Sequence, residues 1–113
     1  MKEFLLLYRA DVTNIPQRSP EEAQATTKKW IDWIQNLAAQ NQLVDKGNRL
    51  DHSGKVVKED NVVLNGPYTE IKESLGGYSL IKAESYEAAI DLVKDCPIFL
   101  SGGNVEIREI NPL

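Results

Sequence analysis

The segment from Asn65 to Tyr78 combines turn-forming residues, alternating charges, a glycine pair and tyrosines between two apolar runs. Within it, Glu70 and Lys72 could place a carboxylate beside an ammonium group, and partial desolvation would shift the pKa of either group toward neutrality. Such a pair can orient a polar ligand or transfer a proton. Connections that carry unusual chemistry on a rigid scaffold are where binding and catalysis concentrate. We therefore expect the functional site at this segment, which we call the motif segment.

A pocket beside the motif segment, the first strand and the first helix would have a polar and aromatic lining. In it, Asn65 would orient the ligand by hydrogen bonding, Lys72 would neutralise developing negative charge, and Glu70 would accept a proton in any catalysis. The residues predicted to bind the ligand are Tyr8, Asn65, Tyr68, Lys72 and Tyr78, with Glu70 as the candidate catalytic residue.

These features also have a purely structural interpretation. Asn65, Gly66 and Pro67 would form a turn at the end of a strand whatever the function, and the pattern favours this interpretation. An exposed ion pair between Glu70 and Lys72 would contribute little energy. The sequence alone leaves both interpretations open.

Composition excludes several classes of function. The chain of 113 residues has 13 Lys and Arg against 17 Asp and Glu, and this balance lacks the basic surface that nucleic acid binding needs. Its single cysteine, Cys96, cannot form an internal disulfide. No metal-binding cluster, phosphate loop or nucleotide fingerprint appears, so we expect neither a metal nor a cofactor.

The apolar run Phe4–Leu7 is too short for a signal peptide or membrane span, which predicts a cytoplasmic protein with no membrane partner.

The apolar pattern predicts the elements that hold the motif segment in place. The range Glu3–Tyr8 is apolar at consecutive positions, so as a strand it would bury both faces. Ser19 begins a capping box for a helix that runs to about Gln40. The other predicted elements are an extended region from Leu43 that turn residues interrupt from Gly47, a hairpin Lys55–Leu64 turning at Glu59–Asn61, a strand Gly77–Ala83, a helix after Ser85 ended by Pro97, and a strand Val105–Ile110.

This order of elements predicts a single α+β domain spanning residues 1–113. Two β-α-β halves with right-handed crossovers give a ferredoxin-like antiparallel sheet with two helices on one face and, here, an inserted hairpin. The other sheet face stays open, although the first strand is apolar on both faces. Because a monomer of this size rarely exposes so large an apolar patch, we expect a homodimer through the open sheet face.

Three parts of the chain resemble a known family. The runs Leu5–Tyr8, Asn65–Tyr78 and Gly102–Arg108 are similar to the YCII-related family, and most to its subgroup named for an Asp-Gly-Pro-Phe motif. The resemblance extends over nearly the whole chain. It implies a ferredoxin-like fold that dimerises as an α+β barrel, with a pocket near the sheet and the motif segment in each subunit.

The chain departs from the subgroup motif at two positions. Asn65 stands in place of the aspartate, and Tyr68 in place of the phenylalanine. An asparagine side chain cannot take up a proton at neutral pH, which favours binding over catalysis. We therefore expect a YCII-like protein that binds a small polar or aromatic molecule, with catalysis left open. The alternative is a non-catalytic accessory protein of sigma-factor-type transcription regulation, since members of the subgroup resemble proteins often encoded beside alternative sigma factors.

Overall fold

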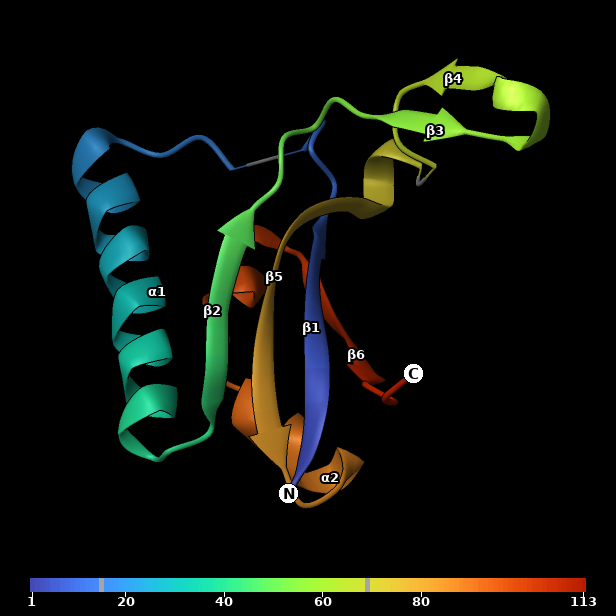
Figure 1. The fold of residues 1–113 in the computed structure, drawn as a ribbon. Coiled ribbons are helices and arrows are strands. Elements are labelled where there is room, and N and C mark those ends of the chain that lie inside the picture. The colour runs from blue at the N-terminus through green and yellow to red at the C-terminus, as the bar shows by residue number, and fades with distance from the viewer. Residues whose placement is uncertain (15, 69) are drawn as a thin grey trace.

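The computed structural model describes residues 1–14, 16–68 and 70–113, and its centre is an antiparallel sheet of four strands in the order β2-β5-β1-β6 (Figure 1). These strands are β1 (Lys2–Ala10), β2 (Leu43–Arg49), β5 (Ser74–Ala83) and β6 (Asn104–Glu109), and the helices are α1 (Pro20–Ala39) and α2 (Tyr86–Val93). This is the α+β, ferredoxin-like arrangement that the sequence predicts.

The side chains of β1 show which face of the sheet the helices cover. Phe4 and Leu6 are fully buried, and Tyr8 is nearly so. The ring of Phe4 packs edge-on against Tyr86 of α2, with centroids 4.9 Å apart, and the ring of Tyr8 packs edge-on against Trp30 of α1, with centroids 5.0 Å apart. Because residues at i and i+2 of a strand share a face, both helices lie on the same side of the sheet, as predicted.

The long helix begins as the sequence predicts. The Ser19 hydroxyl accepts a hydrogen bond from the Glu22 amide, and the Glu22 carboxylate accepts one from the Ser19 amide, which completes the capping box. Trp33 and Leu37 are buried against the sheet, but Ile31 is half exposed. Only part of the apolar surface of α1 is therefore buried.

One glycine predicted to interrupt an extended region belongs to a strand instead. Gly47 lies inside β2 at a bulge, where the register between β2 and β5 shifts. Its φ of +73° is a left-handed conformation that glycine adopts readily and that one type of bulge uses. Gly77 lies within β5, which begins earlier than predicted, at Ser74. The extended region from Leu43 is thus one continuous edge strand, whose register against β5 shifts between Leu43 and Asp45 and again between Asp45 and Asn48.

The end of the second helix also differs from the prediction. Helix α2 ends at Val93, and Pro97 is the first residue of a short 3₁₀ helix, η3 (Pro97–Ser101). Proline fits this first position because its fixed φ suits the helix and its missing N–H would have no partner there. Pro97 therefore starts a new turn of helix and does not terminate α2.

The predicted hairpin is confirmed and forms an arm, which we define as residues 55–65. It pairs β3 (Lys55–Val57) with β4 (Val63–Asn65) around the 3₁₀ turn η1 (Glu59–Asn61). The arm projects away from the main sheet (Figure 1), and the molecule measures 46 × 44 × 19 Å. Large apolar side chains of the arm are exposed, namely Val57, Val62, Val63 and Leu64. None of the helices in the described residues has the length and apolarity to cross a membrane.

Candidate functional site

The sheet face opposite the helices is not covered by any described element (Figure 1). On it, Leu5 of β1 lies opposite Leu80 of β5 and Arg108 of β6. Residues directly opposite each other in an antiparallel pair share a face. The next such row is Asn48, Tyr78, Leu7 and Glu106. We call this surface the open face, and its residues are Glu3, Leu5, Leu7, Arg9, Asp45, Asn48, Tyr78, Leu80, Lys82, Glu106 and Arg108.

The centre of the open face is apolar and one edge is polar. Leu5, Leu7 and Leu80 are only half-buried, because nothing in the described chain packs on them. On the β2 side, the Asn48 side-chain amide donates a hydrogen bond to the Tyr78 hydroxyl at 3.2 Å. The hydroxyl thereby keeps its own hydrogen for another acceptor. An apolar floor with a few fixed polar groups is the usual lining of a small-molecule site.

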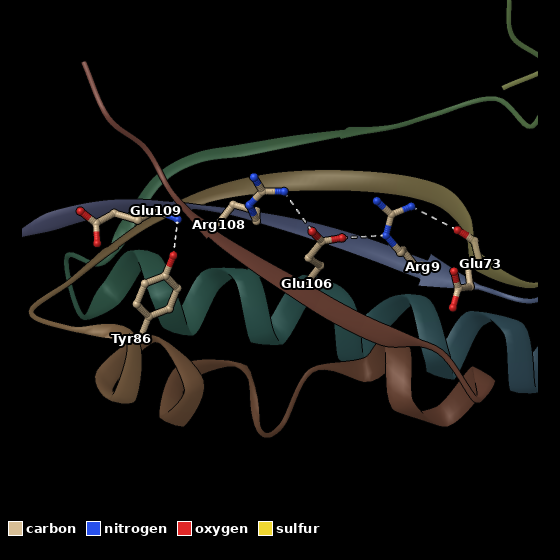
Figure 2. Close-up of polar contacts among 6 residues, drawn as sticks. All are labelled: Arg9, Glu73, Tyr86, Glu106, Arg108 and Glu109. Atoms are coloured by element: carbon tan, nitrogen blue, oxygen red, sulfur yellow. Dashed lines mark hydrogen bonds and ion pairs between the residues drawn. The ribbon is translucent and has the colours of Figure 1, made fainter. Parts of the chain in front are cut away.

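A charged cluster occupies the opposite edge of the open face (Figure 2). Arg9 donates from Nε to one carboxylate oxygen of Glu106 at 3.0 Å and from Nη1 to the backbone carbonyl of Glu73 at 3.2 Å. Arg108 donates from Nη1 to the other carboxylate oxygen of Glu106 at 3.2 Å. Glu106 therefore bridges two guanidinium groups, and the Arg9 guanidinium is fixed at two points.

These bonds hold the pKa of the Glu106 carboxyl below its ordinary value, first through the bond from Arg9 and then through that from Arg108. Because the pKa is lower in the folded state, the contribution of Glu106 to stability is present above the ordinary glutamate pKa of about 4.3. The contribution is lost as the pH falls through the lower folded value. At neutral pH Glu106 is therefore a carboxylate, and the cluster keeps all its charges.

We predict a pH-dependent loss of stability that Glu106→Gln diminishes. Below the ordinary glutamate pKa, the free energy of unfolding of the native protein should fall more steeply with pH than that of the variant. Urea titrations between neutral and acid pH measure both slopes. The matched control is Glu84→Gln, which removes an exposed carboxylate outside the cluster and should leave the native slope unchanged. Parallel curves for Glu106→Gln and the native protein would contradict the prediction.

Tyr8 and Tyr78, predicted to line one pocket, lie on opposite faces of the sheet. Tyr8 is 7% exposed on the helix side and donates its hydroxyl to the Ser79 hydroxyl at 2.8 Å. Ser79 in turn donates to the Lys46 carbonyl at 2.6 Å. Burial raises the pKa of the Tyr8 phenol, which stays protonated. Tyr8 thus belongs to the core and not to the open face, and its apolar neighbours rather than a ligand explain its position.

The other predicted site residues lie on the arm or between the arm and β5. The Asn65 side-chain carbonyl accepts a hydrogen bond from Lys55 Nζ at 2.7 Å, which links the two strands of the arm. Tyr68 is 78% exposed. Glu70 and Lys72 are exposed at the 3₁₀ turn η2 (Ile71–Glu73), and no hydrogen bond or ion pair between described residues joins them. Their ligand contacts stay predictions.

The structure brings part of the motif segment to the open face. Tyr78 lies on this face, and the backbone carbonyl of Glu73 holds Arg9 at its edge. Asn65 and Tyr68 are separated from it by the turn that precedes β5. Sequence reasoning missed Arg9, Glu106 and Arg108. Glu106 and Arg108 occupy alternate positions of the last strand, so the sequence indicates that they share a face. It does not reveal that Arg9 of β1 is their partner.

Two grooves lie away from the open face. One of about 520 Å³ runs between α1 and η3, with Trp33, Phe99 and Leu100 in its lining. Cys96 also lines it, but burial raises the pKa of this thiol to about 12, so it is not a nucleophile at neutral pH. The other, of about 550 Å³, lies along the arm at Val57, Val62 and Tyr68.

Among the described residues, no group of three or more His, Cys, Asp or Glu side chains is placed to hold a metal ion.

Comparison with known proteins identifies the family. One similar solved structure is that of 5-chloro-2-hydroxyhydroquinone dehydrochlorinase (TftG) from Burkholderia phenoliruptrix AC1100 in complex with 2,5-dihydroxybenzoquinone. The two chains are 17% identical with a TM-score of 0.41, and the similarity covers 96% of this chain and 93% of that one. At this identity the similarity gives no information on activity. No curated protein matches the sequence. The model of the YCII-related domain matches residues 2–113, and the chain therefore belongs to the YCII-related family.

Proposed function

We propose that this protein binds a small polar or aromatic molecule on the open face, in a pocket that a second copy of the chain closes. The observation that carries the proposal is the composition of that face. Leu5 and Leu7 lie between the strand of Tyr78 and the strand of Glu106 and Arg108, and Leu80 extends this half-buried apolar surface beside Tyr78. A planar organic molecule could stack on the leucines while its polar groups meet the fixed donors at either edge.

The shape of the subunit supports the homodimer. With helices on one side only, the molecule is 19 Å thick in its thinnest direction, and no element of the described chain covers the leucines of the open face. A second sheet packed face to face would supply that layer, at the spacing of about 10 Å typical of stacked sheets. The arm projects beyond the ends of the strands (Figure 1), and its exposed apolar residues would offer the partner further surface.

Binding rather than turnover is the proposed activity. We also place the chain in the subgroup named for the Asp-Gly-Pro-Phe motif, on the strength of Asn65–Tyr68, and in it Asn65 replaces the residue best suited to proton transfer. Glu70 remains the candidate base if a reaction occurs. Neither the contacts of the described residues nor the comparisons favour the accessory hypothesis, so it rests on the family resemblance alone.

A thermal-shift screen of small aromatic and polar molecules tests the proposal. A compound at a hundredfold excess over its Kd should stabilise the folded protein by about 2.7 kcal/mol. That stabilisation corresponds to a rise in Tm of about ten degrees for a chain of this size. For each compound that raises Tm, amide chemical shifts in a ¹⁵N-labelled protein should change on the open face at Leu5, Leu7, Tyr78 and Leu80.

The same screen on Glu70→Ala asks whether the motif turn belongs to the site. A smaller shift in Tm would place Glu70 at the ligand, whereas an equal shift would remove it. Compounds that perturb only the helix-side groove or the arm, or a screen in which no compound raises Tm, would contradict the proposed function.

A further inference from the structure

The cluster on the β6 edge of the open face carries an unbalanced positive charge. Arg9 and Arg108 contribute two positive charges and Glu106 one negative charge, and 2 − 1 leaves +1. Both oxygens of Glu106 already accept bonds from guanidinium groups, so its carboxylate is shared between the arginines. A partner subunit over this face would remove water from the cluster, and a charge without a counter-ion is costly there.

The two arginines have different roles. The Arg9 side chain is 20% exposed and fixed by Glu106 and by the Glu73 carbonyl, whereas the Arg108 side chain is 68% exposed and makes one described contact. A guanidinium has five N–H donors, so most of those on Arg108 have no partner among the described residues. Arg9 therefore positions Glu106, and Arg108 is the group available to a ligand. Guanidinium groups bind carboxylates in a paired, planar geometry.

The row structure of the sheet sets the distance between the two polar edges. Tyr78 and Glu106 both lie opposite Leu7, one on each side of β1. Because neighbouring strands are about 4.8 Å apart, these edges are separated by about 10 Å. One six-membered ring with substituents at opposite ends, hydrogen-bonded at each, spans such a distance over an apolar floor formed by Leu5 and Leu7.

From this geometry we infer that the ligand is an organic acid whose carboxylate binds Arg108 and whose ring lies on Leu5 and Leu7. A polar group at the far end of the ring reaches the Tyr78 hydroxyl and the Asn48 amide. The inference rests on the proposed function and adds to it the charge class and the orientation of the ligand.

Paired probes that differ only in charge test the inference. Para-hydroxybenzoate and para-hydroxybenzamide have the same shape, and isothermal titration calorimetry gives the ratio of their affinities for the native dimer, for Arg108→Gln and for Arg49→Gln. Arg49 is an exposed arginine of β2 opposite Gly77, whose row lies on the helix side of the sheet, so it controls for net charge. We expect the native protein and Arg49→Gln to prefer the acid by about tenfold, as one charge-assisted hydrogen bond provides, and Arg108→Gln to lose that preference.

The outcomes separate this inference from the proposed function. Equal binding of acid and amide on the open face, or a preference that survives in Arg108→Gln, overturns the inference and leaves the proposed function standing. Binding of neither probe overturns both. A weaker dimer in Arg108→Gln with no change in the affinity ratio would mean that an acidic side chain of the second copy balances the cluster, and the inference then fails.

Discussion

Gly47→Ala should destabilise the protein by about 3 kcal/mol or more, at the upper end of single substitutions. Gly47 lies at the bulge in β2 with a φ of +73°, and a Cβ atom there would lie 1.7 Å from the carbonyl oxygen of Tyr78. No side-chain rotation relieves a clash with backbone, so β2 must separate from β5 near this point. The bulge also sets the position of Asn48 beside Tyr78, so the β2 edge of the open face should be lost with it.

A second glycine with the same backbone conformation isolates the clash. Gly102 has a φ of +71°, but an added Cβ would meet nothing within 4 Å. Gly102→Ala should therefore cost only the strain of the left-handed conformation, about 1–2 kcal/mol. Urea unfolding of both variants measures the difference. Equal destabilisation of the two variants would show that the bulge adapts to a side chain and would contradict the account of β2.

Leu7→Lys should convert the proposed dimer into a folded monomer. In the single subunit Leu7 is only half-buried, so the ammonium group would remain solvated and the fold would be preserved. In a dimer closed over the open face, the same ammonium group would be buried beside a cluster that already has a net positive charge. An uncompensated buried charge costs about 3–5 kcal/mol. With one such charge in each subunit, the Kd of the dimer should rise by about a thousandfold or more.

Ile31→Lys is the matched control for Leu7→Lys. Ile31 is 50% exposed on α1, on the opposite side of the sheet, and its replacement adds the same charge without touching the open face. This variant should keep the native mass in sedimentation velocity, and both variants should keep the native circular dichroism. Dissociation by both substitutions, or by neither, would contradict an interface at the open face.

Much of the fold can be predicted because local patterns and tertiary packing agree. The capping box at Ser19 and the acidic turn of the arm depend on neighbours within four residues, and both are present. Pro97 and Gly47 show where local reasoning fails. Both residues have strong turn preferences, but Pro97 begins a 3₁₀ helix and Gly47 forms a bulge inside a strand. Their conformations depend on packing against strands that are distant in the sequence.

The candidate site was harder to predict because it is assembled across strands. Arg9 and Glu106 are 97 residues apart in the sequence, and only the register between β1 and β6 brings them together. Tyr8 was misleading for the same reason. Its residue type suits a ligand site, but the alternation of β1 places it on the helix side with Phe4 and Leu6. The position of Tyr78 on the open face, in contrast, can be predicted from the alternation of side chains along β5.

The mass of the native protein in solution tests the central claim most directly. A second subunit should cover the open face, so multi-angle light scattering at low micromolar concentration should give twice the chain mass of 12.7 kDa. The pocket, the buried leucines and the charge argument at Arg108 all depend on that layer. A mass equal to one chain under these conditions would contradict the account, because the open face would then be an ordinary solvated surface.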